Sequence, residues 1–116
     1  IAALGHVQQW VGEMEVKLTA ARAVLHEAAR AWATRQDPAL AGRIAAAKYL
    51  CTNAACEVTD IALRVAGGFS LTPHLPLERH FRDARAGLFQ PPQDDLALGL
   101  LGRGALAART HKVHAA

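Results

Sequence analysis

The amino-acid sequence predicts an all-α protein, an antiparallel up-and-down helical bundle that forms one domain over residues 1–116. The first observation is composition: 52% of the residues are hydrophobic but only 5% are aromatic, and alanine is the most frequent residue, which is typical of close-packed helices and not of β-sandwiches. The second is that apolar residues recur every three or four positions over long stretches. The third is that glycines and prolines cluster between these stretches, where helices end.

The first predicted helix carries apolar residues at alternating steps of four and three, which makes a heptad-like seam of about seven turns. The seam consists of Val7, Val11, Met14, Leu18, Ala21, Leu25, Ala28 and Trp32. We expect this helix to end at Gln36, because Pro38 disfavours a helical conformation at Asp37 and suits the first turn of the next helix.

The second predicted helix repeats the pattern with smaller side chains, which allow another helix to approach closely. Its seam consists of Ile44, Ala47, Cys51, Ala54, Val58, Ile61 and Val65. It ends at Gly67-Gly68, since glycine tolerates the left-handed conformation that follows many helices. Cys51 and Cys56 point about 140° apart on this helix, so they form no disulfide and are expected to be free thiols of a reducing cytoplasm.

A loop from Phe69 to Leu75 leads to a third predicted helix, which begins at Pro76 and is closed by Pro91-Pro92. Its apolar face consists of Leu77, Phe81, Ala84 and Leu88, and its polar face predicts the ion pairs Glu78–Arg82 and Arg79–Asp83.

The last predicted helix runs from Leu96 to about Arg109, preceded by Asp94-Asp95, where the helix dipole favours negative charge. It contains three glycines, which weaken an isolated helix, so we expect it to be stable only when packed. Residues 110–116 are expected to fray.

Several classes of protein and site are excluded by the sequence. The net charge is +3, but the basic residues are scattered, so no nucleic-acid surface is predicted. No apolar stretch reaches the roughly 20 residues of a membrane span, and no histidine pair has the spacing of a metal site. The chain begins with Ile1 and not with Met, which leads us to expect a segment of a longer protein.

Four motifs at characteristic spacings resemble a known family. They are Ala47-Lys48, Gly67-Gly68, Pro76–Arg79 (P-L-E-R) and Arg82–Arg85 (R-D-A-R). Together they resemble the C-terminal α-helical domain of the acyl-CoA dehydrogenase family of flavoproteins. The resemblance implies N-terminal and middle domains elsewhere in a longer chain, an acyl-CoA or other small-molecule substrate, FAD bound between domains, and a homodimer or homotetramer built through these helices.

The resemblance also implies a set of cofactor contacts. Gly67-Gly68 stands where backbone amides approach the FAD of a neighbouring subunit, although a plain helix end is the alternative interpretation. Arg64 replaces the family's usual Gln, and it either reaches a pyrophosphate oxygen or is a solvated surface charge. Gln93 stands at the position of a cofactor-contacting Thr.

One departure from the family affects the chemistry. Many of its dehydrogenases carry Y-E-G-T after the third helix, and the Glu removes the α-proton of the acyl-CoA. This chain places Pro91 at the Glu, and proline cannot act as a base. We interpret Asp94 and Asp95 as dipole partners of the last helix, so no catalytic residue is assigned. Three alternatives stay open: a dehydrogenase whose base lies elsewhere, a flavin-dependent monooxygenase of the same fold, and a non-catalytic helical bundle or degenerate subunit.

Overall fold

The computed structural model describes residues 3–115. Ile1, at which we expect a segment of a longer protein to begin, lies outside the described residues. The α-helices are α1 (Gly5–Thr34), α2 (Ala41–Ala66), α3 (Leu77–Phe89) and α4 (Asp94–Ala115). Short 3₁₀ helices occupy Pro38–Leu40 and Gly67–Leu71, and the described part of the chain contains no strand. The predicted all-α fold is confirmed. None of the described helices is both long and apolar enough to cross a bilayer.

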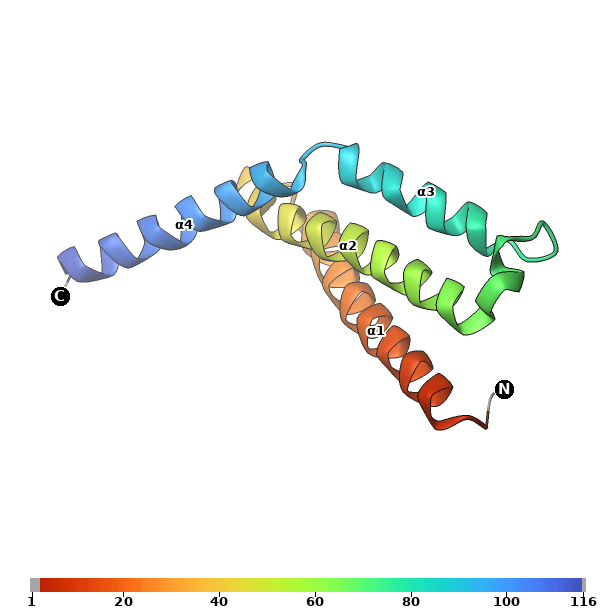
Figure 1. Ribbon diagram of the computed structural model, residues 1–116. Coiled ribbons are helices and arrows are strands. Elements are labelled where there is room, and N and C mark those ends of the chain that lie inside the picture. Colours follow the sequence, from red (N-terminus) through yellow and green to blue (C-terminus); the bar gives the residue numbers. More distant parts are fainter. Residues whose placement is uncertain (1–2, 116) are drawn as a thin grey trace.

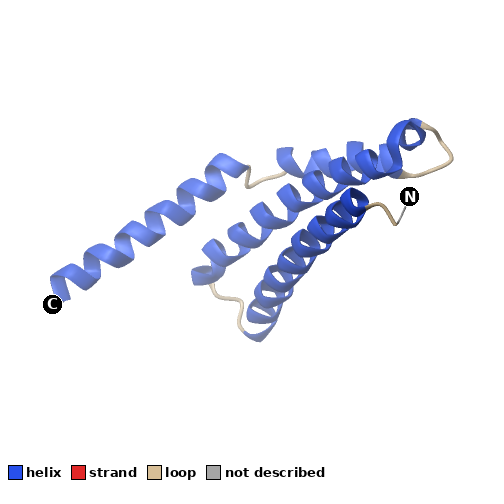
Figure 2. Ribbon diagram, turned by 60° about the horizontal axis from the view of Figure 1, so that its bottom comes forward, coloured by secondary structure: helices blue, strands red, loops and turns tan. Residues whose placement is uncertain are grey.

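Helix α2 lies at the centre of the molecule and contacts each of the other three helices. Helices α1 and α3 run antiparallel to it, so the first three helices form the expected up-and-down arrangement (Figure 1). Helix α4 leaves this group and projects away from it (Figure 2), which gives the molecule extents of 58 × 28 × 27 Å. The fourth helix therefore extends the bundle and does not complete it.

The connection between α1 and α2 lies where Pro38 predicted a break between two helices. Helix α1 ends at Thr34, two residues before the predicted Gln36, because Arg35 adopts an extended conformation. The Asp37 carboxylate accepts a hydrogen bond of 2.9 Å from the Ala39 amide, and Pro38 occupies the first position of the 3₁₀ helix. Pro38 thus begins the next helical segment, as predicted.

The first seam is only partly buried. Val7, Ala21 and Ala28 of α1 are buried against α2, whereas Leu25 and Trp32 keep 48% and 40% of their surface exposed. Across the same interface Lys17 donates a hydrogen bond to Glu57, and this bond raises the pKa of Lys17. Only part of the predicted apolar stripe is therefore covered by this chain.

The contact between α2 and α3 is close. Lys48 Nζ donates a 2.8 Å hydrogen bond to the carbonyl of Gly87, near the end of α3. A Cβ placed on Gly87 would lie 2.8 Å from Thr52 Cγ2, so a larger residue here would require Thr52 or α3 to shift. The Glu78–Arg82 ion pair forms at 3.5 Å, but the predicted Arg79–Asp83 pair is wrong, since these groups do not come within 4 Å.

The two thiols point to different helices, as predicted. Cys51 Sγ lies 3.4 Å from the Ala21 carbonyl of α1, and Cys56 Sγ lies 3.6 Å from the Ala84 carbonyl of α3. Both are free and half-buried. The direction of each side chain follows from their spacing of five residues on one helix.

Two predictions about irregular segments are wrong. The expected loop from Phe69 to Leu75 begins inside a 3₁₀ helix, which covers Gly67–Leu71. The expected frayed tail is helical to Ala115, with Ala116 outside the described residues. Lys112 and His114 are basic residues in the last turn of α4, where the negative end of the helix dipole stabilises positive charge.

Candidate functional site

The double glycine lies at the turn that follows α2. Gly67 has a φ of 65° and a ψ of −152°, a conformation that is essentially restricted to glycine. Its amide donates to the carbonyls of Arg64 and Leu63, which closes the last turn of α2. Gly68 is exposed, and a Cβ placed on it meets no atom within 4 Å. The backbone at Gly68 is therefore open to a ligand.

Arg64 lies on the last turn of α2, one turn before Gly67. Its guanidinium pairs with the Asp60 carboxylate at 2.8 Å, and 64% of the Arg64 side chain is exposed. The guanidinium also borders a hollow lined by Glu13, Glu57 and Asp60. Because these carboxylates offset its charge, Arg64 would bind a phosphate oxygen only in competition with Asp60.

Gln93 is exposed and precedes α4, and its carbonyl accepts a 2.9 Å hydrogen bond from the Ala97 amide. The next residue, Asp94, accepts a 3.0 Å hydrogen bond from Asn53 in the middle of α2. Asn53 and Arg64 are separated by about 16 Å along the helix axis, at 1.5 Å per residue. The structure thus brings Arg64, Gly67 and Gly68 together but leaves Gln93 apart from them.

The half-buried Asp94 directs its carboxylate toward α2. Its Oδ2 accepts from Asn53, whose amide group also donates to the Tyr49 carbonyl at 2.9 Å. Its Oδ1 is buried and accepts no hydrogen bond from the described residues. Asp94 and Asp95 both lie in the first turn of α4, which confirms their predicted place at the positive end of the helix dipole.

The loop between α2 and α3 contains two features that the sequence analysis missed. The rings of Phe69 and His74 stack in parallel, with centroids 5.5 Å apart and an interplanar angle of 5°. Beside them, His74 and Arg79 border a hollow of about 390 Å³. The only sequence signal is a phenylalanine directly after the double glycine, in a segment expected to be an exposed loop.

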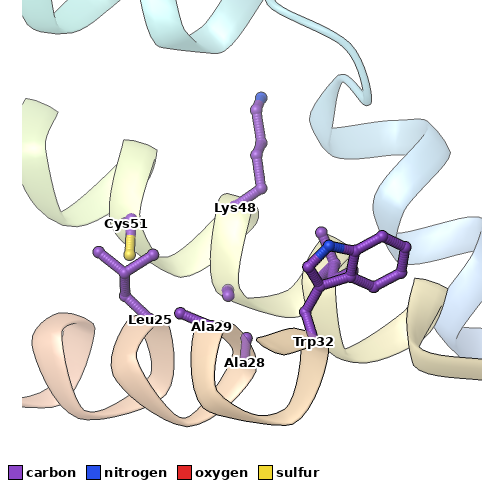
Figure 3. Close-up of a pocket in the computed structure, with 8 residues that line it drawn as sticks. Leu25, Ala28, Ala29, Trp32, Lys48 and Cys51 are labelled. Carbon is purple, nitrogen blue, oxygen red and sulfur yellow. The ribbon is translucent and has the colours of Figure 1, made fainter. Parts of the chain in front are cut away.

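An apolar groove of about 460 Å³ runs between α1 and α2. Figure 3 shows Leu25 pointing toward Cys51, Trp32 at one end, and Lys48 directed away from α1. Burial raises the pKa of the Cys51 thiol, so less of it is thiolate near neutral pH. The groove offers packing surface but no polar arrangement for chemistry. Within residues 3–115, no three side chains of the metal-binding types gather into a candidate metal site.

Residues 1–90 match the family described as "Acyl-CoA dehydrogenase, C-terminal domain". The chain belongs to the acyl-CoA dehydrogenase family. The matched residues contain α1, α2 and α3 with the double glycine, whereas Pro91, Gln93 and α4 lie beyond them. The resemblance inferred from the motifs is confirmed.

The chain is also similar to YdbM of Bacillus subtilis (strain 168), whose name describes a candidate acyl-CoA dehydrogenase. The two are 44% identical over 93 residues. This match covers 79% of the present chain but only 24% of YdbM, so the chain spans about a quarter of the length of this curated relative.

Proposed function

We propose that this chain is the C-terminal helical domain, over residues 1–116, of a cytoplasmic FAD-dependent oxidoreductase that acts on the CH–CH bond of acyl-CoA substrates. Its partners would be the N-terminal and middle domains of a longer chain and further copies of itself, in a homodimer or homotetramer. Family membership supports this proposal, and so does the length of YdbM, of which the chain spans 24%. The observation that carries it is the open backbone at Gly67 and Gly68.

The residues of this chain fit FAD at the end of α2. Glycine at both positions leaves the backbone accessible to a bulky ligand, and a side chain at Gly68 would fill that space without disturbing the fold. When bound, FAD would supply the two-electron acceptor. Gln93, which lies near the middle of α2, would contact a different part of the cofactor from Gly67 and Gly68.

A flavin-dependent monooxygenase of the same fold is the second candidate. Pro91, which stands at the position of the family's catalytic Glu, carries no ionisable group. Asp94 does not replace that Glu, because one of its oxygens accepts a hydrogen bond from Asn53 and the other is buried. A base for α-proton removal would therefore come from outside this chain, and a reaction of reduced flavin with dioxygen would need no such base.

The cofactor is tested on the full-length protein by its visible spectrum and by FAD titration of the apoprotein. We expect Gly68→Val to weaken FAD binding at least tenfold, because the new side chain occupies the cofactor's approach. Gly104→Val on α4, where a Cβ also meets nothing within 4 Å, is the matched control and should bind FAD normally. A colourless protein that takes up no FAD would overturn the proposal.

The reaction is tested by mixing the oxidised flavoprotein with a panel of acyl-CoA substrates without oxygen. Bleaching of the flavin would support the dehydrogenase. If no acyl-CoA bleaches the flavin, and the photoreduced protein consumes dioxygen while it hydroxylates an added substrate, the monooxygenase replaces it.

A further inference from the structure

Helix α4 projects from the other three helices, and most of its length is uncovered (Figure 2). Every residue from 102 to 115 is exposed in the described part of the chain. A single uncovered helix is marginally stable in water, and α4 also contains Gly99, Gly102 and Gly104, each of which destabilises a helix relative to alanine. The helix is nevertheless continuous to Ala115. Its outer half therefore lacks a packing partner among the described residues.

Two leucines of α4 lie on a face that does not contact α2. Leu98 and Leu106 keep 51% and 67% of their surface exposed, whereas Ala97 is completely buried. Successive residues of an α-helix are about 100° apart, so Leu98 and Leu106 point about 100° and 180° away from Ala97. Gly102 lies between the two leucines on the same face, and a Cβ placed on it meets no atom within 4 Å. This face is therefore open and apolar, with its lowest point at Gly102.

The exposed face of α4 has the same pattern in both directions from Gly102. It consists of Asp95, Leu98, Gly102, Leu106 and Arg109, which are separated by three, four, four and three residues. Neither Asp95 nor Arg109 forms an ion pair with another residue of the described chain. The face thus carries two unpaired charges of opposite sign, at equal distances from a central glycine.

We propose that the α4 helices of two copies of this chain pack antiparallel along this face, with both Gly102 residues at the two-fold axis. In this arrangement Asp95 lies opposite the partner subunit's Arg109, and Leu98 lies opposite the partner subunit's Leu106. Each contact occurs twice, as a two-fold interface requires. Glycine at the crossing point lets the two helices approach closely. A parallel arrangement would place like charges opposite each other. The inference rests on the proposed function for the homodimer and assigns one of its surfaces.

The crossing point is tested by oxidative cross-linking of the full-length protein that carries Gly102→Cys. A disulfide requires Cα atoms within roughly 7 Å of each other, a condition that two residues at the two-fold axis fulfil. Gly104→Cys is the matched control, because a Cβ there also meets no atom within 4 Å but points about 160° away from Gly102. We expect Gly102→Cys to link two copies about tenfold faster than Gly104→Cys. The wild-type protein gives the background from Cys51 and Cys56.

The pairing of the charges is tested by charge reversal in the Gly102→Cys protein. Asp95→Arg turns two attractive pairs into two repulsive ones, so it should slow the cross-linking about tenfold. Adding Arg109→Asp restores opposite charges at both contacts and should restore the rate. Lys112→Asp changes the same charge as Arg109→Asp but lies outside the proposed face, and it should leave the rate within about twofold. An unchanged rate in Asp95→Arg would overturn the antiparallel pairing of Asp95 with Arg109.

The outcomes separate this inference from the proposed function. If the protein binds FAD and is oligomeric, but Gly102→Cys forms no more disulfide than Gly104→Cys, the inference is overturned while the proposed function stands. Alkylation of the new thiol then shows whether another domain of the longer chain covers α4 instead. If Gly102→Cys links two copies of a protein that takes up no FAD, the proposed function is overturned and the inference stands. A monomeric full-length protein would overturn the inference together with the proposed homodimer.

Discussion

The two sides of α2 are packed in different ways. Toward α3, Gly87 packs against Thr52, and Lys48 donates a hydrogen bond to the Gly87 carbonyl. Toward α1, buried alanines alternate with the half-exposed Leu25 and Trp32, and a groove of about 460 Å³ remains. Both interfaces contain small residues, Gly87 of α3 on one side and the buried alanines on the other, but only the first is closed.

This difference shows that small residues alone do not close a helix pair. Glycine at position 87 removes the side chain at the point of closest approach, and the bond from Lys48 holds the end of α3 in place. Between α1 and α2 the helices touch only at the buried alanines, and the large side chains of Leu25 and Trp32 border an open groove. The α2–α3 pair should therefore be sensitive to single changes that the α1–α2 groove tolerates.

The largest effect is expected from Gly87→Val, which would force α3 away from α2. The added Cβ would lie 2.8 Å from Thr52 Cγ2, and overpacking of this kind costs about 2 to 3 kcal/mol. Hydrogen–deuterium exchange of the α3 amides in the full-length protein measures the loss in local stability. Gly104→Val, which meets no atom within 4 Å, is the control. Unchanged protection of α3 would show that Thr52 yields and that the contact is not close packing.

The sequence predicts most of the fold because helix ends and seams are local signals. Pro38 begins the 3₁₀ helix that leads into α2, and Gly67 has the positive φ that its place after a helix suggested. The Phe69–His74 stack was not predictable, because a 3₁₀ turn has no apolar periodicity from which side-chain directions follow. Helix α4 contacts α2 through residues far apart in the sequence, such as Asn53 and Asp94, which are separated by 41 residues, and local patterns do not predict such contacts.

The candidate site was predictable only in part. The residues around Gly67 are neighbours in sequence and lie together at one helix end. Whether Gln93 joins them depends on where α3 ends along α2, and that is set by the Lys48–Gly87 contact between helices. Arg79 was predicted to pair with Asp83 by its spacing, but spacing of four residues permits an ion pair without requiring it.

A smaller effect is expected from Lys48→Met, which keeps the apolar stem of the side chain but removes the 2.8 Å bond to the Gly87 carbonyl. The loss of one bond from a charged donor costs about 1.5 kcal/mol, and it should appear as faster exchange in the last turn of α3 only. Lys112→Met on the exposed end of α4 removes the same charge and should leave that turn unchanged. If the last turn of α3 is protected equally in Lys48→Met and Lys112→Met, the packing of Gly87 alone closes the α2–α3 interface.

The smallest local effect is expected from Leu25→Gln in the groove between α1 and α2. Leu25 is already 48% exposed, so a polar side chain of similar size should change the stability of α1 within the 116-residue chain by less than about 0.5 kcal/mol. Exchange of the α1 amides in the chain and in the full-length protein provides the measurement. If the groove is covered by other parts of the full-length protein, the same change there would bury an unpaired amide and cost about 1 to 3 kcal/mol. Equal small effects in both would show that the open side of α2 faces solvent in the complete protein too.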